Sequence, residues 1–195
     1  MNRKQTVIGA LVVLVLIAAG VLFFVFREDH TVSDAAAQGF FASTSTSPAS
    51  ALGAQLAPHR QAPAGEKEYY DTQYRFSLLY PQDLDVEKHD EGGGESVITF
   101  QDLQSAQGFQ IFILPYTENQ VTEARFNADE PSGVMRSPSN VTIDGATATS
   151  FYSTNAALGD TAEIWFIHGG YLFEVTTLKP LASWLSQIME TWKFI

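Results

Sequence analysis

The densest group of side chains that could bind a metal ion lies in the segment DLDVEKHDEGGGE, residues 83–95. Hard cations such as Ca²⁺ prefer clustered carboxylate oxygens, but Lys88 stands where a calcium-binding loop needs glycine for its sharp turn. On a strand, alternate carboxylates would share one face, which suits a solvated sheet edge equally well. Two interpretations therefore remain, a plain acidic edge and a weak divalent-metal site with the candidate ligands Asp85, Glu87, His89, Asp90 and Glu91.

Other chemistry finds no supporting motif. A serine nucleophile needs a histidine base, and His168, which adjoins a predicted hairpin turn, is typical of a structural turn residue. The glycines at 92–94 lead into a strand pattern without the Gly-Lys-Ser/Thr of a phosphate loop. The chain has no cysteine, which excludes thiolate chemistry and disulfides. We expect no catalytic residues and no cofactor; the alternative is an enzyme whose Asp, Glu and His residues come together only in the fold.

The charge balance excludes one class of partner. Of the 195 residues, 22 are acidic and 11 are Lys or Arg, giving a formal net charge of -11. Phosphate backbones are held mainly by clustered Lys and Arg, so we expect no nucleic-acid partner.

An uncharged apolar run, TVIGALVVLVLIAAGVLFFVF, occupies residues 6–26. As a helix it would reach roughly 31 Å, which matches the hydrocarbon core of a bilayer. A cleaved signal peptide would have a shorter apolar core followed closely by a small-residue cleavage site. Here the alanines at 35–37 begin nine residues after Phe26. The pattern favours an uncleaved transmembrane helix over a cleaved signal.

Flanking charges predict the orientation of this helix. Arg3 and Lys4 precede it, whereas Arg27 is followed at once by two acidic residues. The positive-inside bias therefore leaves residues 1–5 in the cytoplasm and places the remainder outside it. Residues 27–65 read as a flexible linker, since Ala, Ser, Thr, Pro, Gly and Gln fill 27 of the 35 positions from Thr31 to Gly65.

Residues 66–195 are expected to form the folded domain, and strand patterns dominate it. Apolar residues alternate along YRFSLLY, and EIWFIHGGYLFEVTT reads as a hairpin that turns at Gly169-Gly170. Its centre is apolar on both faces, so the sheet needs cover on both sides. A weaker helix is predicted from Val121 to Asp129, and the tail from Lys193 is expected to return as a short strand or to pack its Phe. A second helix is predicted from the apolar stripe Leu181, Trp184, Leu185, Ile188 and Trp192.

The order of YRFSLLYPQDLDV, IDGATATSFY, IWFIHGGYLFEVTT and LSQIMETWKFI resembles the PsbP-like superfamily, whose founding members are extrinsic lumenal proteins of photosystem II. The resemblance covers roughly residues 69–195. It implies an α+β fold, an α–β–α sandwich around a mostly antiparallel sheet, with a binding or assembly role outside the cytoplasm. Together with residues 6–26, it predicts a single-pass membrane protein whose exported domain meets a membrane-proximal protein or ligand.

Overall fold

The structure is a computed structural model that describes residues 58–195. The predicted transmembrane helix at 6–26, and the linker as far as residue 57, lie outside the described residues. Within residues 58–195 there is no helix both long enough and apolar enough to cross a bilayer.

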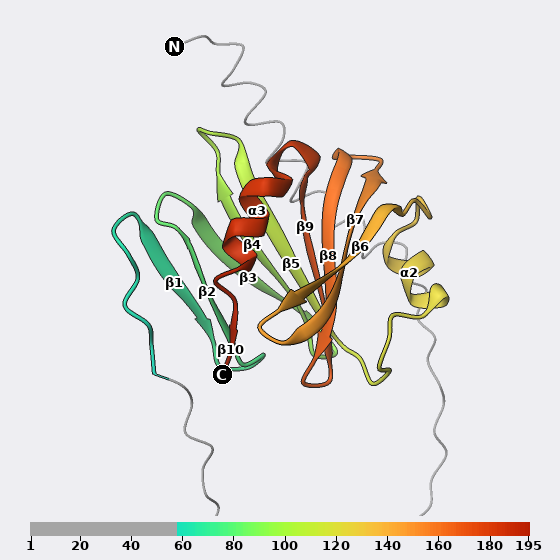
Figure 1. Cartoon of the computed structure of the whole chain (residues 1–195), viewed down its shortest axis with the longest axis horizontal. Helices are drawn as coiled ribbons and strands as arrows, with labels where there is room; N and C mark the ends of the chain where they lie inside the picture. Colours follow the sequence, from blue (N-terminus) through green and yellow to red (C-terminus); the bar gives the residue numbers. More distant parts are fainter. Residues whose placement is uncertain (1–57) are drawn as a thin grey trace, which may run out of the picture.

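The described residues form two antiparallel sheets and two α-helices, an α+β fold as the sequence predicts (Figure 1). A seven-stranded sheet has the order β3-β4-β5-β9-β8-β7-β6, and a three-stranded sheet has the order β1-β2-β10. The elements are β1 (Glu66–Asp71), β2 (Phe76–Pro81), β3 (Asp85–Gly92), β4 (Glu95–Asp102), β5 (Gln107–Pro115), α2 (Glu123–Asp129), β6 (Arg136–Ile143), β7 (Ala146–Asn155), β8 (Gly159–His168), β9 (Tyr171–Leu178), a 3₁₀ helix (Lys179–Leu181), α3 (Ala182–Met189) and β10 (Lys193–Phe194).

The predicted hairpin at the centre of the large sheet is confirmed. Strands β8 and β9 pair with His168 opposite Tyr171 and Phe166 opposite Phe173. Gly169 and Gly170 form the turn with φ of 60° and 85°, the positive values that a two-residue hairpin turn requires. This register sends Phe166 and Phe173 to one face of the sheet, and Trp165 and Glu163 to the other.

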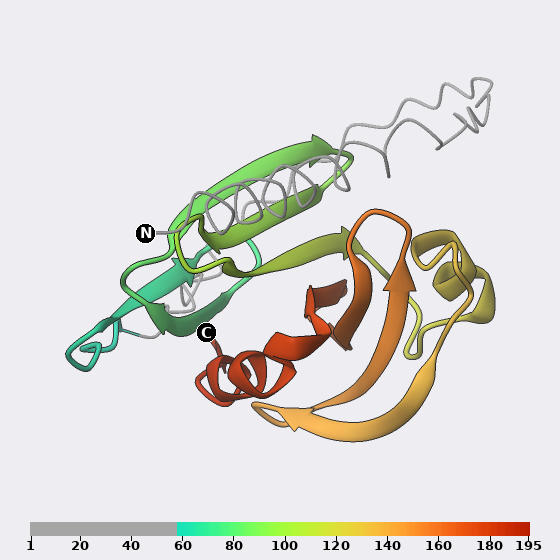
Figure 2. The ribbon, with the colours of Figure 1, turned by 90° about the horizontal axis from the view of Figure 1, so that it is seen from above.

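The main core lies on the concave face of the large sheet. Figure 2 shows this sheet curled around α3, with the small sheet beside the helix. Phe76 of β2 stacks on Trp192 and packs edge-on against Phe173 of β9, and all three side chains are buried. Burial of these aromatic rings holds the small sheet and the chain's last turn against the large sheet.

The expected α–β–α sandwich is not the arrangement found. On the concave face the small sheet shares the cover with α3, because the inward residues of β2 form an apolar layer of their own: Phe76, Leu78 and Tyr80. The opposite face, which carries side chains such as Phe151 of β7 and Trp165 of β8, is called the outer face here. The seven-residue helix α2 packs on this face.

Both predicted helices exist, with shifted ends. Helix α2 begins after Thr122, whose Oγ1 accepts a hydrogen bond from the Arg125 N–H, and it ends before Pro131. Helix α3 ends at Met189, before the predicted stripe reaches Trp192. There Thr191 Oγ1 accepts the Leu79 N–H at 2.8 Å, and the chain turns back to pair β10 with β2.

Candidate binding groove on the outer face of the sheet

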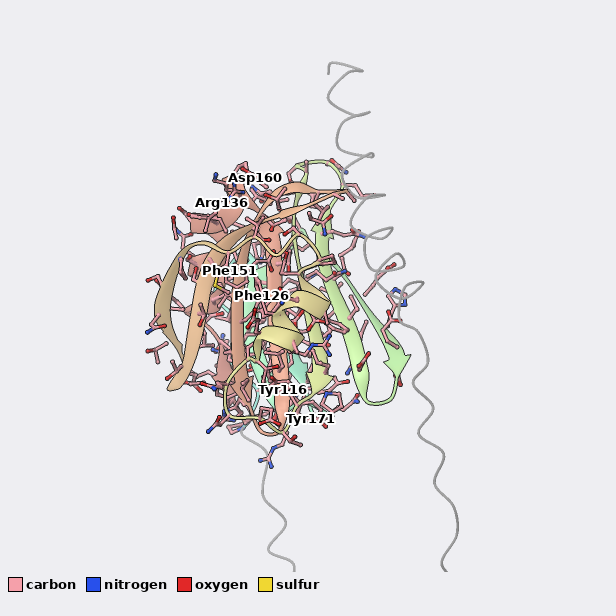
Figure 3. All side chains as sticks on the ribbon, turned by 90° about the vertical axis from the view of Figure 1, so that its right-hand side faces the viewer. Tyr116, Phe126, Arg136, Phe151, Asp160 and Tyr171 are labelled. Carbon is pink, nitrogen blue, oxygen red and sulfur yellow. The ribbon has the colours of Figure 1, made fainter. Side chains whose placement is uncertain are left out.

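A groove of about 730 Å³ lies between the outer face of β7 and β8 and the connection from β5 to β6. We call residues 116–135 of this connection the cap segment; it includes α2. Figure 3 shows α2 crossing in front of the sheet, with Phe126 beside Phe151. The described lining residues are Asn119, Gln120, Val121, Thr122, Glu123, Phe126, Met135, Thr147, Thr149, Phe151, Trp165, Phe166 and Ile167.

Aromatic rings attach the cap segment to the sheet. Phe126 of α2 lies 5.9 Å from Phe151 of β7 and 5.7 Å from Trp165 of β8, measured between ring centroids. Phe151 and Trp165 are themselves 5.4 Å apart and nearly perpendicular, and both are buried. Such edge-to-face clusters stabilise an interface beyond their buried area. The inner wall of the groove is therefore apolar and firmly placed.

The open side of the groove is mixed in character. Thr147 and Thr149 point outward from β7 on the same face as Phe151, because side chains alternate along a strand. Met135 is 41% exposed, which is unusual for a large apolar side chain. Glu123 is the charged residue among the described lining side chains. This lining suits a partly apolar partner that is uncharged or cationic.

The two ends of the cap segment are fixed by hydrogen bonds. At its start, the Tyr116 N–H donates to the Gly170 carbonyl at 2.8 Å, which joins the cap segment to the β8–β9 turn. Near its end, Ser153 Oγ donates to Glu130 Oε2 at 2.6 Å. Between these two points the cap segment runs over the sheet and contacts it through the Phe126 ring.

Beneath the end of the cap segment lies a carboxyl group that sequence reasoning missed. Glu163 of β8 is only 1% exposed, and its Oε2 accepts hydrogen bonds from Thr176 Oγ1 at 2.6 Å and from Trp165 Nε1 at 3.4 Å. Burial, with a smaller contribution from the charge of Glu130, raises the pKa of Glu163 to about 7 against these hydrogen bonds. Glu163 is therefore largely protonated in weakly acidic solution.

Burial also raises the pKa of Glu130, although hydrogen bonds from Ser153 and Ser132 oppose the change. Arg125, the basic residue of α2, forms an ion pair with Asp129 of the same helix. Within residues 58–195, no basic side chain forms an ion pair with Glu163 or Glu130.

The sequence offers one signal for Glu163: an acidic residue inside an otherwise apolar strand, AEIWFI.

The predicted metal ligands lie elsewhere, on the edge strand β3. Asp85, Glu87, His89 and Asp90 are exposed and Glu91 is half-buried. The His89 ring pairs with Glu87, with 3.5 Å between Nε2 and Oε2. Across the described part of the chain, no three acidic or histidine side chains are grouped so that they could hold a metal ion. The weak metal site therefore stays a prediction.

The histidines do not join the buried carboxyls. His168 stacks on Phe194 with ring centroids 3.5 Å apart, and burial lowers its pKa. None of the three histidines in residues 58–195, His59, His89 and His168, lines the groove. The described lining of the groove therefore contains no histidine base.

Comparison with known proteins places the fold. No protein-family model matches the chain, and no curated protein matches it in sequence. Comparison with solved structures shows that the domain has a PsbP-like fold, as the sequence resemblance predicts. One matching structure is the solution structure of cyanobacterial PsbP (CyanoP) from Synechocystis sp. PCC 6803, with a TM-score of 0.51 and 13% sequence identity. The alignment covers 71% of this chain and 98% of that one.

Proposed function

We propose that this chain is a non-enzymatic single-pass membrane protein that presents a PsbP-like binding or assembly domain outside the cytoplasm. The uncharged run at 6–26 and the positive residues before it support the anchor and its orientation. A tether of the length of residues 27–57 would raise the effective concentration of the domain near membrane-bound partners.

The observation that carries the binding role is the groove of about 730 Å³ between the cap segment and the outer face. Its volume lies in the range of pockets that hold ligands, and apolar walls with a few polar groups are their usual lining. Charge selects the occupant: the described residues include 19 acidic and 8 basic side chains, and Glu123 is at the groove itself. We therefore assign the groove to a partner-protein segment with apolar side chains and no negative charge.

Site-specific photocrosslinking in native membranes tests this assignment. A photoreactive amino acid at Thr147, in the groove, is expected to give a defined partner adduct, whereas the same group at Glu87, on exposed β3, is not. Met135→Glu places a second negative charge at the groove and should reduce the Thr147 adduct at least several-fold. Equal adducts at Thr147 and Glu87, or no effect of Met135→Glu, would exclude the groove as the binding site.

The anchor is tested separately by protease treatment of spheroplasts. Added protease is expected to degrade the domain in intact spheroplasts and to spare a cytoplasmic marker protein. Protection of the domain until the membrane is lysed would contradict the proposed orientation. Release of the domain from the membrane fraction by high salt or alkaline carbonate would contradict the anchor.

A further inference from the structure

We propose that the cap segment is a proton-controlled cover of the groove, closed while Glu163 and Glu130 hold at least one proton between them and lifted when both are ionised. The inference rests on the proposed function for what the groove binds, but the movement itself is measurable without a partner.

The geometry places the two carboxyl groups on opposite sides of one interface. Glu163 belongs to the sheet, on β8, and Glu130 belongs to the cap segment, directly after α2. Hydroxyl and indole groups, which carry no charge, donate the hydrogen bonds to both of them. Two negative charges here would therefore repel each other across the contact that holds the cap segment down.

The surrounding elements supply little positive charge. From β9, Thr176 lies opposite Glu163, and Glu174, another buried carboxyl, lies opposite Trp165. From β7, the uncharged Phe151 lies opposite Glu163. From β5, Gln110 lies opposite Thr176.

The nearest arginines already have carboxylate partners. Arg125 of α2 pairs with Asp129. Arg136, at the start of β6, bonds Asp160, the Ser153 carbonyl and Thr154. A buried carboxylate without a cation is costly, so the closed state keeps its proton.

The contacts that oppose the opening are side-chain contacts and single hydrogen bonds. They include the Phe126 ring contacts, the Tyr116 N–H bond to the Gly170 carbonyl, the Ser153 bond to Glu130, and the contact of Ser132 Oγ with Ser153 Oγ at 3.3 Å. The cap segment adds no strand to the sheet, so it can lift while every ladder of the large sheet stays paired. A segment outside the strand ladders can open locally at a lower free energy than the whole domain.

The direction of the pH dependence follows from the acid itself. The pKa of Glu163 is about 7 when the cap segment is closed, against 4.5 for the free side chain. The closed state is thus most favoured below pH 4.5, and it loses this advantage as the pH rises to about 7. Between pH 5 and pH 8 the ratio of open to closed molecules should rise roughly seventy-fold.

Amide hydrogen exchange on the full chain at pH 5 and pH 8, corrected for intrinsic exchange rates, tests the proposal. The reporters are the N–H groups of Phe126 and Glu130, which bond Thr122 and Phe126 carbonyls inside the cap segment. Their protection should fall roughly seventy-fold in the native protein and stay nearly constant in Glu163→Gln, which cannot ionise. Glu118→Gln, which removes an exposed carboxylate of the cap segment outside the groove lining, should behave as the native protein does.

Equal protection at both pH values, or the same loss in Glu163→Gln, would overturn the proposal. Should Glu163→Gln fail to fold, Glu130→Gln serves instead, because it removes the repulsion from the other side and should reduce the loss. If the exchange of the cap segment depends on pH but no groove-dependent crosslink forms, the proposed function is refuted and the proton-controlled cover is supported. If a groove-dependent crosslink forms but the exchange of the cap segment does not depend on pH, the proton-controlled cover is refuted and the proposed function is supported.

Discussion

Phe76 and Trp192 stack face to face, with their ring centroids 4.2 Å apart and their planes inclined by only 5°. Phe76 begins β2, and Trp192 directly precedes β10, so the stack joins the first hairpin of the domain to its last turn. Both side chains are almost inaccessible to solvent. The three-stranded sheet is thereby locked onto the concave face of the large one.

Phe76→Ala is therefore expected to lower the free energy of unfolding by about 3–5 kcal/mol, since it leaves a cavity among packed aromatic rings. Urea denaturation of the purified chain, followed by tryptophan fluorescence, measures the change. Leu103→Ala is the matched control, because Leu103 is 50% exposed and its loss should change stability by less than about 0.5 kcal/mol. Similar effects of the two substitutions would show that the stack does not hold the sheets together.

A second prediction concerns Arg60, which lies before β1. Its guanidinium donates to Glu68 at 3.1 Å, to the Thr191 carbonyl at 2.7 Å and to Ser77 Oγ at 3.1 Å. Arg60→Ala should cost about 1–3 kcal/mol, because the nearly buried Glu68 carboxylate loses charged hydrogen bonds. Arg60→Lys should recover little of this, since an ammonium cannot reach all three acceptors in fork geometry.

The Arg60 effect has a defined pH window. Burial acts to raise the pKa of Glu68, but hydrogen bonds from Arg60 and His59 outweigh it and bring the pKa below 4.5. Ionised Glu68 therefore stabilises the fold above pH 4.5, and this contribution is lost as the pH falls through the lowered value. Urea midpoints of the native chain and Arg60→Ala should accordingly converge in strong acid. A constant difference at all pH values would contradict the role of the Glu68 charge.

Glu163 gives the opposite pH dependence. Because its pKa is raised from 4.5 to about 7 in the folded protein, its contribution is fully present below pH 4.5 and declines as the pH rises to about 7. The loss amounts to about 3 kcal/mol over this range if Glu163 becomes solvated on unfolding. Glu163→Gln should remove this part of the pH profile. Parallel profiles for the native chain and the variant would show that Glu163 titrates normally.

Phe126→Ala should detach the cap segment without unfolding the domain. Phe126 contacts both Phe151 and Trp165, whereas the strands beneath form their own hydrogen-bonded ladders. We expect limited proteolysis to cut within residues 116–135 at least tenfold faster, with a loss of global stability below about 2 kcal/mol. Asn127→Ala, next to it on the exposed side of α2, is the control. Unchanged cleavage in Phe126→Ala would mean that other contacts hold the cap segment.

The parts of the fold that could be predicted are those with local signals. The hairpin at Gly169-Gly170 is encoded by two glycines between alternating apolar residues, and its register follows. Thr122 and Pro131 delimit α2 in the same local way. The helix predicted toward Trp192 ended early because a distant partner, the backbone of Leu79, captures Thr191.

The candidate site could not be predicted, because it depends on long-range pairing. Phe126, Phe151 and Trp165 meet only when β7 and β8 are in register and the cap segment folds over them. Glu163 carries one local signal, its place inside the apolar strand AEIWFI, but its burial depends on the fold around it. The composition of the acidic run at 83–95 suggests a metal site. Most of its carboxylates lie on an exposed sheet edge, where charged side chains prevent another strand from pairing with it.

The small sheet carries both ends of the described chain. Arg60 is tied to Thr191, and the Ile195 N–H donates to the Arg75 carbonyl at 3.0 Å, so entry and exit lie together beside β2. Helix α2 lies across the molecule from them (Figure 1). A bulky partner docking over α2 would therefore approach the described domain away from Arg60 and Ile195, and a reporter fused after Ile195 would leave that approach clear.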